Sequence, residues 1–197
     1  MIAAALFIIF SSAFSSIVDG HEINFRPGPL MRELKELDCS GEIKLTEMAL
    51  PLSDKATEKI KGKFFTAGCG DNQAFAVYIG RVNSCRIGGC STSVADDPLS
   101  EYEFFDYYIL FDSRNRIISV RIFNYEATHG QEITAKGWLK QFAGFDGSGL
   151  LRVGKEIDSV SGATVSVYSL VNDIRQKTDI LIRLNTGTGN KIYKSSK

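Results

Sequence analysis

Two neighbouring β-rich runs constrain the fold of this chain more than any other feature. The first, Tyr102–Phe111 (YEFFDYYILF), is apolar and aromatic at both odd and even positions, which is typical of a strand inside a sheet. The second, Arg116–Tyr125, alternates, and its two expected faces are Ile118, Val120 and Ile122, and Arg121, Phe123 and Tyr125. Turn-forming residues at Asp112–Asn115 separate the two runs. The sequence therefore predicts a β-hairpin at the centre of the fold.

The remaining patterns add further strands and helices around this hairpin. Strands are expected at Gly41–Leu50 and Ala74–Ile79, and short helices at Ser53–Gly62 and Thr134–Phe142. A Gly-rich loop follows at Gly144–Gly154. A final amphipathic helix is expected from about Ala163 to Leu184, with one apolar face made of Val167, Leu170, Val171, Ile174 and Leu181. This order predicts an α+β fold: a mostly antiparallel sheet with a central hairpin and a C-terminal amphipathic helix.

The segment Asp158–Thr164 (DSVSGAT) lies directly before this helix and contains the motif D-x-x-S-G-A-T. Ser161 is the expected N-cap of the helix. The first turn of a helix has unpaired backbone N–H groups and the positive end of the helix dipole, so a phosphate on Thr164 is well placed there. Gly162 and Ala163 are small, which allows close approach to the backbone. The alternative interpretation is a capped turn that only starts a helix.

The motif resembles the acceptor motif of the family of extracytoplasmic FMN-binding proteins, which includes the flavin-carrying subunits of sodium-pumping NADH:quinone reductases. In that family a flavin transferase links FMN through its phosphate to the last Thr of the motif. The resemblance implies that Thr164 is the acceptor and that Asp158 helps to present it or to hold a metal-bound phosphate during transfer. Capping of the loop by Asp158 is the alternative. The resemblance also implies an α+β domain in which a helix follows the S-G-A-T motif.

A weaker resemblance to the same family covers roughly Leu30 to Asp179. Family members carry a segment like H-x-E-T-P-G near the flavin, in the loop after the hairpin. The matching stretch here is Thr128–Thr134 (THGQEIT), which keeps His129 and Glu132 but lacks the Thr-Pro-Gly. The cofactor-binding residues that the resemblance implies are Thr164, Ala163, Gly162, Ser161, Asp158, His129 and Glu132. The alternative for His129 is that it caps a turn or faces solvent. Four aromatic residues either line the flavin or belong to the hydrophobic core: Phe104, Tyr108, Phe123 and Tyr125.

The first twenty residues differ in composition from the rest of the chain. Ile2–Ile17 contains only apolar residues and Ser, which is typical of a secretory signal peptide, with candidate cleavage after Ala13, Ser15 or Gly20. An uncleaved membrane anchor is the alternative, although the segment is short for a membrane span. The expected organisation is a leader or anchor at 1–20, an FMN-binding domain at 21–184 and a polar tail at 185–197. The expected location is extracytoplasmic, either periplasmic or on the outer face of a membrane.

Four cysteines become informative in such a compartment: Cys39, Cys69, Cys85 and Cys90. An even number of cysteines in an exported chain favours structural disulfides. Three pairings are possible, of which Cys85–Cys90 closes a tight loop and leaves Cys39 to pair with Cys69. A redox-active pair at Cys85 and Cys90 is the alternative.

Composition and missing motifs exclude several functions. The 23 Lys and Arg residues balance the 23 Asp and Glu residues, so charge gives no support for nucleic-acid binding. The sequence lacks the C-x-x-C pairs typical of zinc sites, the C-x-x-C-H haem signature, the G-x-G-x-x-G nucleotide loop and the G-x-S-x-G nucleophile elbow.

Three hypotheses for function follow. The first is an exported electron carrier with covalent FMN on Thr164, whose partners are a flavin transferase and a membrane-associated redox donor or acceptor. The second is a flavin-dependent reductase of a small molecule such as a quinone or an organic acid. The third is an interaction or sensory module that keeps the fold without the cofactor.

Overall fold

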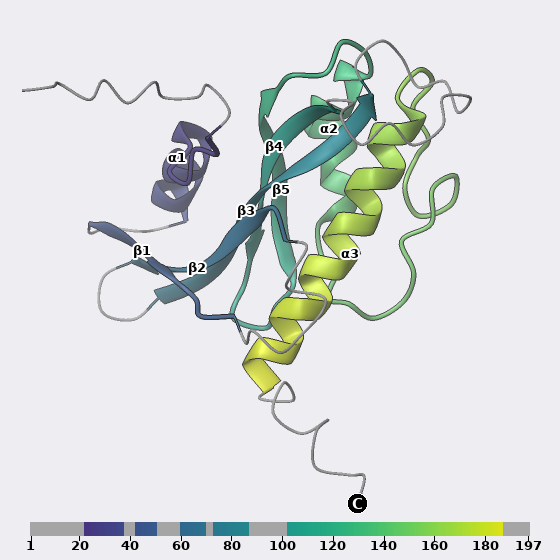
Figure 1. Cartoon of the computed structure of the whole chain (residues 1–197). Coiled ribbons are helices and arrows are strands. Elements are labelled where there is room, and N and C mark those ends of the chain that lie inside the picture. The colour runs from purple at the N-terminus through teal and green to yellow at the C-terminus, as the bar shows by residue number, and fades with distance from the viewer. Residues whose placement is uncertain (1–21, 38–41, 51–59, 70–72, 87–101, 187–197) are drawn as a thin grey trace, which may run out of the picture.

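The computed structural model describes residues 22–37, 42–50, 60–69, 73–86 and 102–186 (Figure 1). Five strands form one antiparallel sheet in the order in which they occur along the chain. These strands are β1 (Ile43–Glu47), β2 (Gly62–Cys69), β3 (Gln73–Arg86), β4 (Tyr102–Phe111) and β5 (Ile117–Tyr125). The helices are α1 (Gly28–Glu36), α2 (Lys136–Leu139) and α3 (Thr164–Thr186), and the 3-10 turns are η1 (Gln131–Thr134) and η2 (Lys140–Phe142). The prediction of an α+β fold with an antiparallel sheet and a C-terminal helix is confirmed.

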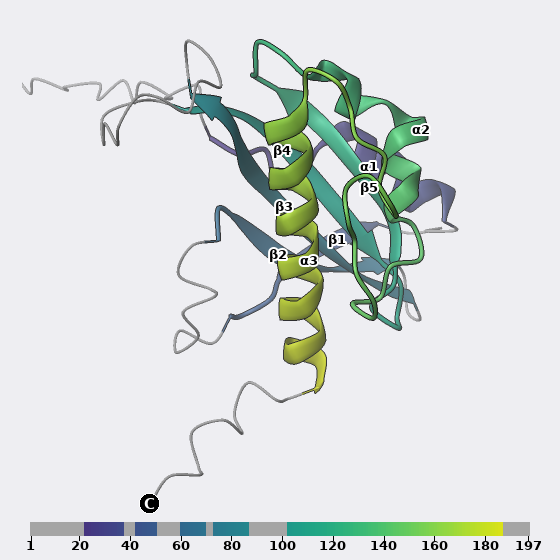
Figure 2. The same cartoon turned by 90° about the vertical axis from the view of Figure 1, so that its right-hand side faces the viewer.

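The sheet separates two hydrophobic cores, because α1 covers one face and α3 covers the other (Figures 1 and 2). Alternate residues of β4 enter the two cores: Tyr107 and Ile109 pack on the α3 side, and Tyr108 and Leu110 pack on the α1 side. Seven consecutive residues of this strand, 105–111, are buried. The apolar character of both faces of β4 therefore follows from its position between β3 and β5 with a helix over each face.

The hairpin is confirmed, but the predicted faces of β5 are wrong. Its pairing with β4 is interrupted twice, once opposite Asp106 and Tyr107 and once opposite Leu110 and Phe111. Each interruption adds one residue to β5, and an added residue reverses the alternation of side chains. As a result Ile118 lies on the α1 side with Phe123, whereas Tyr125 lies on the α3 side with Val120 and Ile122.

α3 has the expected apolar face, because Val167, Leu170, Val171, Ile174 and Leu181 are all buried in the core on that side of the sheet. The predicted helix at Thr134–Phe142 is instead three short pieces, η1, α2 and η2. The predicted strand at Gly41–Leu50 is confirmed as the shorter β1, and that at Ala74–Ile79 as part of the longer β3. α1 and β2 had no counterpart among the predicted elements.

Several predictions fall outside the described residues. They are the leader or anchor at 1–20, most of the expected helix Ser53–Gly62, and nearly all of the tail at 185–197. Gly62 itself is described, and it begins β2 rather than ending a helix. Cys39 and Cys90 also lie outside the described residues, so the disulfide pairing stays a prediction. In the part of the chain that the structure describes, no helix is both long and apolar enough to cross a membrane.

Candidate functional site

The motif forms a tight turn that leads directly into α3. The N–H of Ala163 donates to the carbonyl of Val160 at 3.1 Å, and Gly162 takes a left-handed backbone conformation with φ of 79°. The carbonyl of Ala163 accepts the first helical hydrogen bond, from the N–H of Val167 at 2.9 Å. Ala163 therefore occupies the N-cap position, and the prediction that Ser161 is the N-cap is wrong. The small residues let the chain turn sharply at this point.

Thr164 is the first residue of α3, and its side chain is exposed. Ser161 and Gly162 are exposed too, whereas Ala163 is only 3% exposed because it packs into the core. The structure thus separates the roles of neighbouring residues in the motif. Ala163 fixes the turn to the body of the domain, and Thr164 is exposed to solvent.

Two side chains from the helical segment after the hairpin hold the start of the motif. The indole Nε1 of Trp138 donates to the carbonyl oxygen of Asp158 at 2.9 Å. The N–H of Asp158 donates to Oε1 of Gln141 at 2.8 Å. Both backbone groups of Asp158 are therefore paired, while the residue itself is exposed. Trp138 and Gln141 therefore hold the backbone of Asp158 at the start of the turn.

The loop after the hairpin packs against the same turn. Gly130 is buried with φ of 84°, and a Cβ atom at this position would lie 2.9 Å from the Cβ of Ala163. The hydroxyl of Tyr125 donates to the carbonyl of His129 at 2.6 Å, which fixes the loop to the end of β5. The structure therefore brings the loop that contains His129 and Glu132 to the motif. The side chains of His129 and Glu132 are both exposed.

A buried pair of hydroxyls joins the first turn of α3 to the sheet. The Oγ atoms of Ser84 on β3 and Ser166 on α3 lie 2.6 Å apart, and the two residues are 5% and 2% exposed. Burial raises the pKa of the nearby Tyr125 phenol. A hydrogen bond with Ser166 lowers this pKa, whereas the carboxylates of Glu103 and Glu132 raise it further. Sequence reasoning missed Ser84 and Ser166, because a lone serine in a strand carries no signal of its distant partner.

The four aromatic candidates divide between the two faces of the sheet. Tyr125 lies near the motif and stacks on Phe105, with ring centroids 5.7 Å apart. Tyr108 and Phe123 stack on each other on the α1 side, and Phe104 lies under the Arg81 guanidinium at 3.7 Å. Tyr108 and Phe123 lie on the face of the sheet opposite α3, and a role of any of the four aromatic residues beside a flavin stays a prediction.

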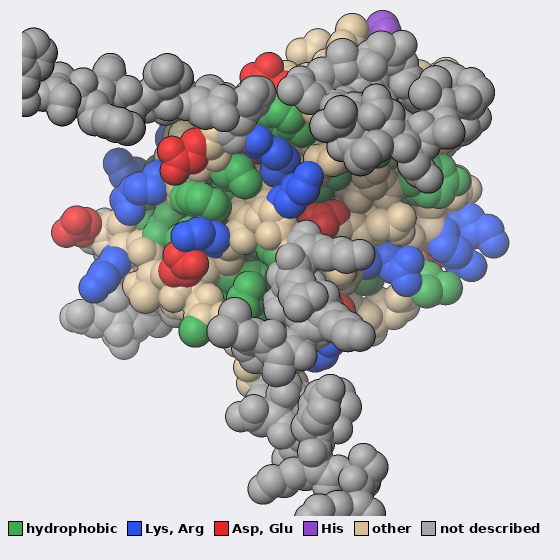
Figure 3. All heavy atoms as spheres, in the orientation of Figure 1, with side chains coloured by type: hydrophobic (Ala, Val, Ile, Leu, Met, Phe, Trp, Pro, Cys, Tyr) green, Lys and Arg blue, Asp and Glu red, His purple; other side chains and the backbone are tan. Residues whose placement is uncertain are grey.

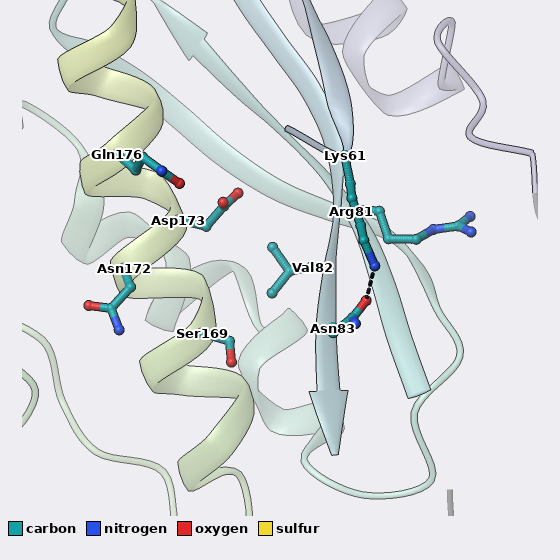
Figure 4. A pocket seen from close by; sticks show the side chains of 8 residues that line it. All are labelled: Lys61, Arg81, Val82, Asn83, Ser169, Asn172, Asp173 and Gln176. Carbon is teal, nitrogen blue, oxygen red and sulfur yellow. Dashed lines mark hydrogen bonds between the residues drawn. The ribbon is translucent and has the colours of Figure 1, made fainter. Parts of the chain in front are cut away.

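A groove with a volume of about 570 Å³ runs between α3 and β3 (Figure 4). On the strand side, Nζ of Lys61 donates to Oδ1 of Asn83 at 3.1 Å. On the helix side, Asp173 accepts hydrogen bonds from the Tyr107 hydroxyl at 2.5 Å and from Nζ of Lys177 at 2.6 Å. The groove is thus lined by polar groups of both signs whose positions are fixed by neighbours.

Surface charge agrees with the balanced composition of the chain. Basic and acidic side chains are interspersed over the face of the molecule seen in Figure 3.

Among the described residues, no group of three or more His, Cys, Asp and Glu side chains is arranged to hold a metal ion.

No protein-family model, curated protein or solved structure matches this chain. Assignment of function therefore depends on the motif and on the geometry around it.

Proposed function

We propose that this chain is an exported flavoprotein that carries FMN on Thr164 through a phosphoester bond and transfers electrons. The observation that supports this most is the position of Thr164. It is an exposed residue at the start of a 23-residue helix, after a turn of small residues that is fixed from several sides.

The residues present fit a phosphate at this position. The first intrahelical hydrogen bond of α3 is made by the N–H of Val167, so the N–H groups of Thr164, Val165 and Ser166 come before it. Such N–H groups, together with the positive end of the helix dipole, favour an anion. A phosphodiester on Thr164 keeps one negative charge, which this helix terminus stabilises.

Attachment is a substitution at phosphorus. A bond forms between the Thr164 hydroxyl oxygen and the phosphorus of a flavin nucleotide, the leaving group of that nucleotide departs, and the hydroxyl proton is lost. The chain therefore gains the mass of FMN minus one water. Asp158 is exposed in the same turn, and we assign to its carboxylate the role of presenting Thr164 or holding a metal-bound phosphate during transfer.

The electron chemistry belongs to the flavin, which when bound supplies a group that accepts and returns electrons. The residues of the chain attach and orient the cofactor. His129 and Glu132 are placed on the loop that packs on Ala163, and their exposed side chains are the groups that we assign to contacts with the cofactor. The partners in this proposal are a flavin transferase and a membrane-associated redox donor or acceptor outside the cytoplasm.

The test is the intact mass of the denatured protein after co-expression with a flavin transferase. We expect a gain of one FMN minus one water, lost in Thr164→Ala. Ser159→Ala is the matched control, because it removes an exposed hydroxyl five residues away, at a position that the motif leaves open, and should leave the gain unchanged. Retention of the flavin in Thr164→Ala would contradict the assignment. If the mass does not increase although the same transferase labels a second protein, covalent flavinylation of this chain is refuted.

A further inference from the structure

We propose that Tyr168 and Val165, on the outer side of α3, form the surface on which the isoalloxazine ring of FMN stacks. This assignment rests on the proposed function, because it concerns the FMN attached to Thr164. It adds that the ring lies on the surface of the domain, with one face against Tyr168 and the other open to a redox partner. α3 covers the sheet with its outer side toward the viewer in Figure 2.

Two exposed apolar side chains lie next to Thr164. Tyr168 is 51% exposed and Val165 is 38% exposed, and they are two of the four large apolar residues that are exposed in the described part of the chain. Residues three apart on a helix are neighbours on its surface, so the two form one patch. The apolar face of α3 that packs on the sheet is a different one, so packing inside the domain does not account for this patch.

Thr164 and the patch lie on one side of α3. At about 100° per residue, Tyr168 lies about 40° around the helix from Thr164, and Val165 lies about 60° further round. Tyr168 is also one turn further along, because four residues at a rise of about 1.5 Å span about 6 Å. Side chains of helical residues lean toward the helix N-terminus, so the ring of Tyr168 lies over the turn that begins at Thr164. The patch is therefore adjacent to the attachment point.

The tether of FMN has a length that matches the extent of the patch. Its ribityl chain has five carbons and spans about 8 Å when extended, with bonds of roughly 1.5 Å. A ring attached to Thr164 through the phosphate thus reaches Tyr168. Further along the same side, the helix is polar, because Asn172 and Arg175 follow at about 12 and 16 Å from Thr164 along the axis. The apolar patch ends where the tether no longer reaches.

A phenol beside an aliphatic side chain suits one face of an isoalloxazine. Aromatic rings prefer offset stacking, and such pairs gain about two- to tenfold in their association constant. Tyr168 forms no hydrogen bond or ring contact with another described residue, so its ring is available for stacking. A flavin stacked on an exposed side chain keeps its second face in solvent. A partner protein can therefore exchange electrons with the ring by direct contact.

The first experiment measures flavin fluorescence in chains loaded by a transferase, relative to the amount of flavin that intact mass and absorbance show. A tyrosine in contact with an excited isoalloxazine quenches its fluorescence by a reversible electron transfer, whereas leucine does not. Tyr168→Leu should therefore raise the fluorescence about twofold or more. Tyr168→Trp keeps an aromatic electron donor and should not raise it. Arg175→Leu is the matched control at an exposed position further along the same side of α3, and should leave the fluorescence unchanged.

Two results of this experiment would assign the ring or the patch differently. A rise in Tyr125→Phe, without a rise in Tyr168→Leu, would place the ring at the loop that contains His129 and overturn the assignment. Unchanged fluorescence in Tyr168→Leu, together with a slower gain of FMN mass in a limited reaction, would assign the patch to contact with the transferase and would also overturn it.

The second experiment attaches the ring without a transferase. In Thr164→Cys, a maleimide whose linker to the isoalloxazine is as long as the ribityl phosphate is coupled to residue 164, and peptide mass confirms the labelled position. Adding Tyr168→Leu should raise the fluorescence about twofold or more, whereas adding Arg175→Leu should not change it. No rise with Tyr168→Leu would overturn the assignment. A rise in this chain, when a transferase adds no FMN mass to the unmodified chain, would refute the covalent link and leave the stacking surface standing.

Discussion

Gly130 is the contact between the loop that contains His129 and the turn that presents Thr164, and we expect Gly130→Ala to damage both stability and flavinylation. The added Cβ atom would lie 2.9 Å from the Cβ and 3.1 Å from the Cα of Ala163. Neither atom can move freely, because Ala163 is 3% exposed and its carbonyl accepts the first hydrogen bond of α3. The left-handed conformation of Gly130, with φ of 84°, adds strain for any residue with a Cβ atom.

Gly144→Ala separates these two effects. Gly144 has almost the same conformation, with φ of 86°, but a Cβ atom there meets no other atom within 4 Å. Both variants should therefore lose about 1–2 kcal/mol of unfolding free energy through backbone strain. Only Gly130→Ala should lose a further 1–3 kcal/mol or so, through overpacking against Ala163. Urea denaturation followed by circular dichroism measures the difference between the two variants.

The same substitution moves the acceptor hydroxyl, because Thr164 directly follows Ala163. In a limited reaction with a flavin transferase, Gly130→Ala should therefore gain FMN mass more slowly than Gly144→Ala. Equal unfolding free energies for the two variants would refute the claim that Gly130 is in tight contact with the motif. Equal labelling with unequal stability would show that this contact does not position Thr164.

Three further substitutions test other parts of the structure. Asp173→Ala leaves Lys177, which is 2% exposed, without its carboxylate partner, so it should lower the unfolding free energy in urea by about 3 kcal/mol. The side-chain hydrogen bond from Arg152 is the main cause that lowers the pKa of Glu156 from 4.5 to about 2, so this pair stabilises the loop above pH 4.5 and loses its effect as the pH falls toward 2. In Arg152→Gln, carbon NMR should show the Glu156 pKa raised toward 4.5, with the backbone N–H of residue 152 still lowering it, and an unchanged pKa would contradict the pairing. Gly137→Ala, in α2 with no atom within 4 Å of its Cβ position, should raise the unfolding free energy by about 0.4–1 kcal/mol, and a loss would show that this helix needs glycine.

Elements with strong local patterns could be predicted from the sequence. The β4–β5 hairpin has two β-rich runs around turn residues, and Asp112 accepts hydrogen bonds from the N–H groups of Arg114 and Arg116 as such turns require. α3 has a long apolar face at helical spacing. In contrast, α1 has only nine residues and buries only Leu30 and Leu34, so its apolar pattern is too short to stand out.

The errors in β5 and β2 have a different origin. The extra residues of β5 at the two irregular pairings depend on its register with β4, and register is a property of two strands rather than of one. β2 begins at Gly62, where the charged segment before it resembled a helix that ends at a glycine. Phe64 and Phe65, which are adjacent in β2, pack into the two different cores, so the strand lacks the alternation that marks a half-exposed strand.

In the candidate site, too, the sequence indicates a local motif but not the contacts that distant segments make with it. A short motif was enough to single out Thr164, but the motif does not hold itself in place. Trp138 and Gln141 pair with the backbone of Asp158, Gly130 packs on Ala163, and Ser84 reaches Ser166 from the middle of the chain.

These contacts come from the end of β3, the loop after β5 and the short helical segment, so they exist together only in the folded domain. Thr164 therefore projects from a fixed turn whose geometry is set by tertiary structure, and the seven residues of the motif alone cannot reproduce it. A transferase that reads this turn acts on the folded chain. The same contacts that hold the motif also fix where α3 begins against the sheet. A change that tilts the start of α3 should therefore slow the gain of FMN mass in a limited reaction with a transferase, whereas a change confined to the groove between α3 and β3 should leave it unchanged.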